Sequence, residues 1–143
     1  MESAHRNDVK RVRLPGRDIQ RIVGRDAALA SERMTVGLVR YSDDAGPMEP
    51  HQHAEETVFV LEARDARARF GPSPDDLPDT VLLEPGLTLH IPALEWHVFE
   101  WGVQGFADVV VIYGEVDNIR PEDIRRETSG SIQAGTQSGR GAT

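Results

Sequence analysis

The chain has 143 residues and a net charge of −8, with 38% hydrophobic residues, and this size predicts one domain with a single core. It contains no cysteine, which excludes disulfides, thiolate metal sites and cysteine nucleophiles. The acidic charge argues against nucleic acid or an anionic membrane as a partner. No segment approaches the roughly 18 apolar residues of a membrane span, and the polar start does not resemble a signal peptide, so we expect a cytoplasmic protein.

The first 20 residues are charged and have no clear periodicity. This pattern predicts an N-terminal arm that either is mobile or lies against a neighbouring subunit.

Seven segments of the following chain have the composition of β-strands, because β-branched, aromatic and other apolar residues recur in them between clusters of Gly, Pro, Asp and Ser. The segments are residues 34–41, 57–61, 66–70, 80–83, 87–91, 97–101 and 106–113. A proline-rich loop is expected at 71–79, and a hairpin turn at 102–105. Short strands without helical periodicity between them predict an all-β antiparallel sandwich or barrel.

The end of the chain differs in character. Pro121, followed by acidic residues and then by arginines, predicts a short C-terminal helix over residues 121–127. The Gly, Ser, Thr and Gln residues that follow predict a disordered tail. The expected units are therefore an arm at 1–20, a β domain at 21–127 and a tail at 128–143.

Possible metal ligands are concentrated in two short segments, Pro50–Glu56 and Pro92–His97. His51 and His53 lie two residues apart, so both imidazoles would project from one face of an extended strand. His97 must be brought to them by folding. Imidazoles together with a carboxylate form a nitrogen and oxygen donor set that suits divalent metals.

These segments resemble the two motifs of the cupin superfamily, which run approximately G-x5-H-x-H-x3,4-E-x6-G and G-x5-P-x-G-x2-H-x3-N. The resemblance covers roughly residues 33–113. The matching residues are Gly46, His51, His53 and Glu56 in the first motif and Gly86, Pro92 and His97 in the second.

The chain departs from both motifs. Each of the two gaps before His51 and Glu56 is one residue short, Ala63 replaces the closing glycine, Leu94 replaces the inner glycine of the second motif, and Trp101 replaces its asparagine. The resemblance nevertheless implies a small cupin-like antiparallel β-barrel of jelly-roll type. It also implies a metal site formed by histidines and one carboxylate, and a homodimer in which the arm adds a strand to the partner subunit.

Two lines of reasoning select different carboxylates. Strict strand alternation from His51 and His53 places Glu55 on the metal side. Counting back from the position of the closing glycine instead selects Glu56. A bend at residues 54–55 would reconcile the two by turning Glu56, Val58 and Val60 inward. We take His51, His53, Glu56 and His97 as the expected ligands, with Glu55 as the alternative carboxylate.

A metal in such a site keeps one or two positions for water, substrate or dioxygen, and iron, manganese, nickel and zinc all suit these donors. We therefore expect a metal-dependent enzyme that acts on a small organic molecule, with dioxygenase chemistry favoured over isomerase or lyase chemistry. Glu95 or Glu55 would be available for proton transfer. The alternative is a non-catalytic barrel that binds or senses a small molecule.

Two features have open roles. His90 either supports the site or contacts substrate, or is a half-exposed strand histidine. Four aromatic residues near His97 either line a cavity for an apolar or aromatic part of a ligand or pack in the core; they are Trp96, Phe99, Trp101 and Phe106.

Overall fold

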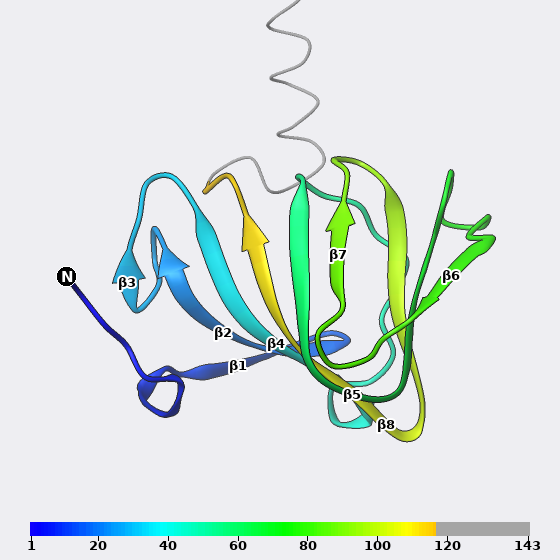
Figure 1. Cartoon of the computed structure of the whole chain (residues 1–143), viewed down its shortest axis with the longest axis horizontal. Helices are drawn as coiled ribbons and strands as arrows, with labels where there is room; N and C mark the ends of the chain where they lie inside the picture. Colours follow the sequence, from blue (N-terminus) through cyan, green and yellow to red (C-terminus); the bar gives the residue numbers. More distant parts are fainter. Residues whose placement is uncertain (117–143) are drawn as a thin grey trace, which may run out of the picture.

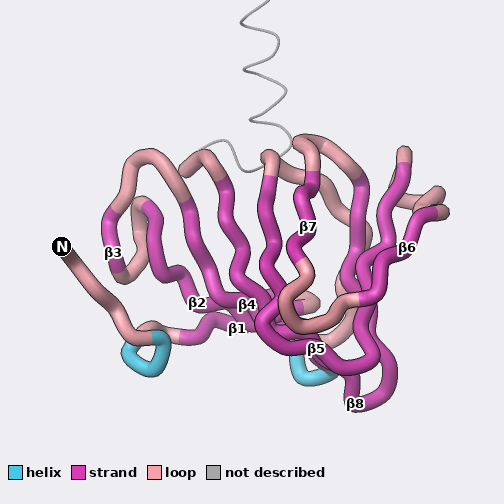
Figure 2. Tube along the Cα trace, viewed as in Figure 1, coloured by secondary structure: helices cyan, strands magenta, loops and turns pink. Residues whose placement is uncertain are grey.

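The computed structural model describes residues 1–116, so the predicted helix at 121–127 and the predicted tail at 128–143 lie outside the described residues. Within residues 1–116 the regular structure is almost entirely β-strand, with two single-turn 3-10 helices, η1 (Arg6–Asp8) and η2 (Asp43–Ala45) (Figure 2). The predicted all-β class is therefore confirmed. No helix in this part of the chain is long and apolar enough to span a membrane.

Eight strands form one strongly curved sheet (Figure 1). Their order is β1-β2-β4-β8-β5-β6, with β3 paired to β2 and β7 paired to β5; apart from the β2–β3 pair, all strand pairs are antiparallel. The strands are β1 (Arg11–Leu14), β2 (Arg17–Gly24), β3 (Leu29–Ala30), β4 (Thr35–Ser42), β5 (Glu56–Gly71), β6 (Asp79–Leu82), β7 (Thr88–Ile91) and β8 (Trp96–Tyr113).

Strands β5 and β8 are longer than the sequence predicted. Each was expected as two short strands, and the hairpin turn at 102–105 is wrong, because β8 runs through this segment and pairs with β5 on both sides of it. Both strands turn over near the bottom of Figure 1. At this turn Asp65 and Gln104 have positive φ angles of 46° and 61°, and the β5–β8 register shifts around Asp65. Bulges of this kind bend a strand without ending it.

Glycine is required where β8 bends against β5. A Cβ atom on Gly105 would lie 2.7 Å from the carbonyl oxygen of Asp65 and 2.8 Å from that of Gly102. Both contacts are shorter than van der Waals packing allows, and both involve backbone, which cannot move aside as a side chain can. The glycines that suggested a turn in the sequence therefore serve the close approach of two continuous strands.

The predicted arm contributes strands to the sheet of its own chain. Strand β1 pairs with β2, and β2 pairs with β4. The buried Gln20 amide donates to the carbonyls of Arg6 and Val9, at 2.6 and 2.7 Å, and the Arg13 guanidinium bonds the buried Asp18 carboxylate. Exchange of this segment between subunits stays a prediction.

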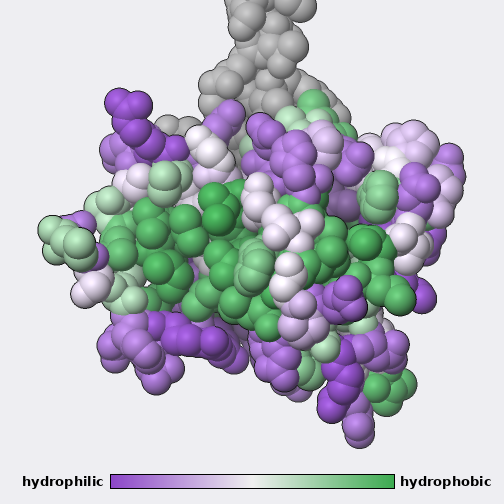
Figure 3. Space-filling model, in the orientation of Figure 1, coloured by the Kyte–Doolittle hydropathy of each residue, from purple (hydrophilic) through white to green (hydrophobic). Residues whose placement is uncertain are grey.

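The core lies on the concave side of the sheet and includes Val58, Val60, Val109 and Phe99, all nearly inaccessible. Alternation along β5 places Phe59 on the opposite face, where it is 40% exposed; Ile112 of β8, which pairs with Thr57, shares that face and is equally exposed. In Figure 3 apolar residues form a band across the side of the molecule that faces the viewer. The sheet therefore has an apolar outer surface as well as an apolar core.

Candidate metal centre

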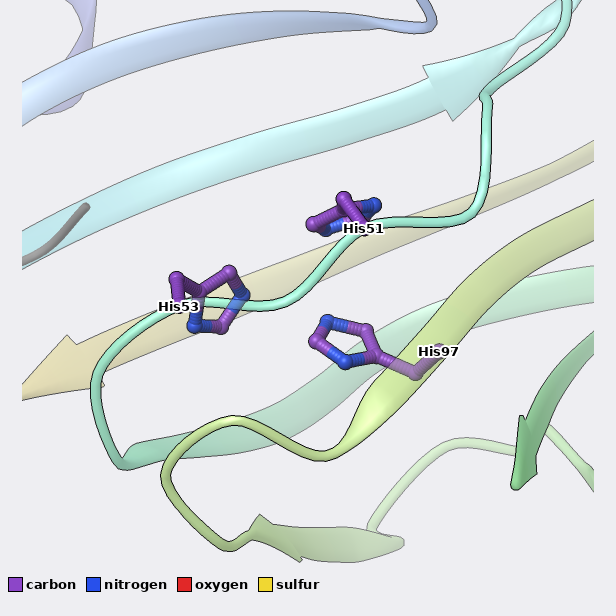
Figure 4. A group of neighbouring side chains, drawn as sticks. All are labelled: His51, His53 and His97. Carbon is purple, nitrogen blue, oxygen red and sulfur yellow. The ribbon is translucent and has the colours of Figure 1, made fainter. Parts of the chain in front are cut away.

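Three histidine side chains converge at one place inside the curved sheet (Figure 4). His51 and His53 lie in the loop between η2 and β5, and His97 is the second residue of β8. Each offers a ring nitrogen, and these three atoms all lie within 4.8 Å of one another. The structure therefore brings together the two segments that the sequence marked as possible sources of metal ligands.

The Nδ1 atom of each ring is held by a backbone carbonyl. His51 Nδ1 lies 3.0 Å from the oxygen of Glu49, and His97 Nδ1 lies 2.9 Å from that of Glu95. His53 Nδ1 is 2.8 Å from the oxygen of Ala54. Because a carbonyl oxygen can only accept, each Nδ1 must carry the proton, and each Nε2 keeps its lone pair. This is the tautomer in which three Nε2 atoms can bind one ion.

The Nε2 atom of His97 is buried and has no hydrogen-bond partner among the described residues. A buried polar atom without a partner costs free energy, and native structures rarely contain one without a reason. Metal coordination would satisfy this lone pair. The donor set, its tautomers and this unpaired nitrogen therefore fit a divalent ion.

Burial keeps the three rings neutral. It lowers the pKa of His53 to about 4 and that of His97 to about 3, and it also lowers the pKa of His51. The neighbouring imidazoles add a smaller effect in the same direction for His53 and His97. A neutral imidazole is the form that binds metal. The three rings are therefore already in the ligating form at neutral pH, before any metal ion binds.

Glu56 begins β5 and points inward, with only 3% of its surface exposed. One carboxylate oxygen lies 3.3 Å from His53 Nε2, although Glu56 is not part of the three-nitrogen group. Burial raises its pKa to about 7, against a smaller lowering by a hydrogen bond from Tyr113. Val58 and Val60 are buried on the same side. The inward set Glu56, Val58 and Val60 is the one that the bent register predicted.

Glu55 lies on the other side of the strand. Its carboxylate is 2.6 Å from His90 Nε2, and both side chains are well exposed. The structure does not bring this pair into the histidine group. A catalytic role for Glu55 stays a prediction, and the observed contact of His90 is with Glu55.

Glu95 lies in the turn before β8, where its carbonyl oxygen accepts from His97 Nδ1. It also lines a cavity of about 210 Å³ together with His97 and Phe99. Glu95 is thus the predicted proton-transfer residue that lies beside the histidine group.

The four aromatic residues near His97 in the sequence have different surroundings. Phe99 stacks on Tyr41 at 4.6 Å between ring centroids and lines the cavity. Trp101 also stacks on Tyr41, at 6.1 Å between ring centroids, and its indole N–H donates to Asp43. The Phe106 ring lies under the guanidinium groups of Arg40 and Arg64. Trp96, at the start of β8, is half-buried and pairs with Gly71.

Sequence reasoning missed Tyr113. This residue ends an apolar strand, and its hydroxyl group is the only polar atom in its side chain. It lies opposite Glu56 in the β5–β8 register and hydrogen-bonds the Glu56 carboxyl group, while its ring contacts that of His53 at 5.3 Å between centroids. The available signal was a phenol at the end of a buried strand, since a buried Tyr hydroxyl usually has a polar partner.

No protein-family model matches the chain, and no curated protein matches it. Solved structures do. The polyketide cyclase RemF from Streptomyces resistomycificus is similar with a TM-score of 0.65 and 26% identity, over 90% of this chain and 93% of that one.

Two other enzymes resemble the chain in fold at lower identity. Hydroxypropylphosphonic acid epoxidase from S. wedmorenis matches with a TM-score of 0.59 and 14% identity, over 79% of this chain and 59% of its own. The DMSP lyase DddQ from Ruegeria pomeroyi DSS-3 matches with a TM-score of 0.55 and 22% identity, over 69% and 47%. This chain spans less than two thirds of either enzyme.

The neighbours share one architecture, a curved antiparallel sheet of the cupin type, and this chain has it together with the converging histidines of its two motif-like segments. The chain is therefore a cupin-fold protein.

Proposed function

We propose that the chain is a metal-dependent enzyme that acts on a small organic molecule bound inside the curved sheet. His51, His53 and His97 are the proposed ligands, with Glu56 as the fourth. The observation that carries this proposal is the fixed tautomer of all three rings, together with the buried, unpartnered Nε2 of His97. A bound divalent ion would supply Lewis acidity toward a substrate oxygen.

The residues around the site suit proton transfer. Glu95 lines the adjoining cavity and is not one of the proposed ligands, so its carboxylate is free to accept a proton from a bound substrate. Similarity to a polyketide cyclase over most of both chains supports acid–base chemistry on a carbonyl compound, such as cyclisation or elimination. We adopt this as the proposed reaction class.

Dioxygenase chemistry, which the sequence analysis favoured, is the second candidate. The supporting observation is the cavity beside His97, whose walls are mainly apolar and would admit dioxygen as well as an apolar substrate group. Nitrogen and oxygen ligands suit iron as well as zinc or nickel, so the donor set alone is compatible with both candidates.

Elemental analysis of the purified chain, combined with oxygen uptake in the presence of carbonyl and enol compounds, tests the proposal. Zinc or nickel without uptake supports acid–base chemistry, and iron with uptake supports the dioxygenase. A protein that holds no metal after purification and takes up none of the four metals on titration would contradict the enzyme proposal. The non-catalytic binding barrel would then be the better description.

We also propose that the chain forms a homodimer through the outer face of its sheet. Phe59 and Ile112 are exposed there. Nearby, the Arg40 guanidinium and the Asp108 carboxylate form an ion pair within the chain, with a nitrogen–oxygen distance of 2.6 Å. An exposed apolar pair beside an ion pair that is already formed within the chain is the observation that supports contact between two copies across this face.

A further inference from the structure

The cavity beside His97 has a composition that restricts what it can bind. Its volume is about 210 Å³, and it extends from the histidine group between β5, β6, β7 and β8. Its apolar lining residues are Ala68, Phe70, Val81, Leu89, Ile91 and Phe99.

Polar groups in this cavity are few and include no permanent cation. They come from Glu95, His90 and His97, and no lysine or arginine is among the lining residues. The His90 side chain is exposed and bonded to Glu55, and His97 is a proposed metal ligand. Glu95 is therefore the remaining polar residue of the lining, and a carboxylate there would repel anions and accept hydrogen bonds.

Two other cavities of the described chain differ in character. One is lined by Arg67, Glu100 and Asp65 beside Trp101, and another by Arg67, Glu100 and Asp43. Charged pairs of both signs border these openings. The cavity beside His97 combines a mainly apolar wall with contact to the proposed metal centre.

The volume sets the size of the bound group. An apolar cavity of about 150 Å³ is enough to bind benzene. The observed 210 Å³ therefore accommodates one ring with a small substituent, and any further part of a larger substrate must extend toward the metal centre or out of the cavity.

We propose that the substrate places one uncharged, ring-sized apolar group in this cavity, with a hydroxyl or N–H group donating to Glu95. This inference rests on the proposed function, because it treats the cavity as the place where the substrate of the metal centre binds. It excludes substrates held there by a carboxylate, phosphonate or phosphate group, since such an anion would meet Glu95 and find no cation to pair with.

The test compares benzyl alcohol with benzoate, which have the same ring and differ in charge. Binding is measured by NMR chemical-shift titration on the full chain, both as purified and after chelation, so that coordination of benzoate to a metal is separated from binding in the cavity. In the chelated protein we expect benzyl alcohol to bind with a Kd at least about tenfold lower than that of benzoate.

A matched pair of variants locates the binding. Val81 lines the cavity opposite Ala68, and its neighbour Leu82 is 73% exposed on the other face of β6. Val81→Trp should weaken benzyl alcohol binding at least about tenfold and leave the metal content unchanged, whereas Leu82→Trp should change neither. Ala68→Leu replaces Val81→Trp if that variant does not fold.

Two outcomes would overturn the inference: equal affinity for benzoate in the chelated protein, or unchanged benzyl alcohol binding in both cavity-filling variants. Either could occur in a protein that holds metal normally, so the proposed function would stand. The opposite result is also distinguishable. A protein that binds no metal, prefers benzyl alcohol to benzoate and loses that binding in the cavity-filling variants would have the ligand cavity but not the proposed enzyme activity.

Discussion

His51 and His97 hold each other in place through their backbones. The N–H group of His51 donates to the carbonyl of His97, and the N–H group of His97 donates to the carbonyl of His51, each at 2.9 Å. This isolated pair of bonds ties the loop before β5 to the start of β8. Because the two ring orientations then depend on one short backbone bridge, the imidazoles are arranged for an ion before it binds.

The first prediction concerns the carboxylate ligand. Glu56→Gln should lower metal affinity about 10- to 100-fold, because Glu56 is buried beside His53, whereas the exposed Glu55→Gln should retain metal as the wild type does. Metal content after dialysis against a graded chelator measures both. Loss of metal in Glu55→Gln alone would mean that the inward register of β5 does not determine the ligand.

A second prediction concerns the stability of the metal-free protein as pH falls. Burial depresses the folded-state pKa values of the three histidines, so below their unfolded value of about 6.5 the unfolded chain binds more protons and stability decreases. Between pH 6.5 and 5.5, His53 and His97 together should remove about 2 kcal/mol, and the lowered pKa of His51 adds a further loss in the same direction.

Glu56 acts in the opposite sense. Its folded pKa of about 7 lies above the unfolded value, so its protonation favours the folded state over this interval and offsets about 1 kcal/mol. Urea unfolding of the chelated protein should therefore show a net loss of at least about 1 kcal/mol from pH 6.5 to 5.5. A stability that stays constant or rises over this interval would contradict the buried, neutral state of the histidines.

The third prediction concerns the bend in β8. Gln104 is exposed and has a φ of 61°, a region that costs a non-glycine residue about 1 to 2 kcal/mol, and its backbone contacts with Asp43 and Arg64 do not need its side chain. After the entropy cost of glycine, Gln104→Gly should stabilise by up to about 1 kcal/mol.

Val103→Gly is the matched control, because Val103 is 90% exposed and its φ is not positive. It should destabilise by roughly 0.5 to 1 kcal/mol. Thermal unfolding of the two variants compares them directly. If both lower Tm equally, the left-handed conformation of Gln104 carries no strain in solution.

A fourth prediction tests the proposed dimer. Phe59→Asp introduces a charge at the exposed outer face without touching the core residues Val58 and Val60. Light scattering should show a dimer for the wild type and a monomer for the variant, while Val12→Asp, at an exposed position of β1, should remain dimeric. A monomeric Val12→Asp would instead favour a dimer formed by exchange of the N-terminal arm. A wild-type monomer at micromolar concentration would dismiss the dimer.

The strands that could be predicted from the sequence were predicted from local patterns of residues. Alternation and turn composition placed β4, β6 and β7, and the outer ends of β5 and β8, within a residue or two, because a strand with one buried face repeats every second residue. Strands β1, β2 and β3 were not predicted. The same rules divided β8 at Gly102–Gly105, since glycine marks a turn and a close approach of backbones equally well. The contact with the backbone of Asp65, which is distant in sequence, is what distinguishes a close approach of two strands from a turn.

The site shows a similar division. The spacing of His51 and His53, together with the resemblance of the second segment to a cupin motif, predicted which three rings meet. The hydrogen-bond partners of those rings were not predicted. Tyr113 and the carbonyl of Glu49 contact the site through long-range register and loop conformation. Leu94 shows a different case: it occupies a glycine position of the motif and adopts a φ of 65°, a conformation that its side chain does not favour.

The place of β8 in the chain has a consequence for biosynthesis. Strand β8 lies between β4 and β5 and carries His97, so neither the central pairing nor the third imidazole exists until it has been made. A ribosome adds about 5 to 20 residues per second. For several seconds the emerging chain therefore exposes His51 and His53 without their partner, and metal loading must wait until synthesis has passed the final described strand.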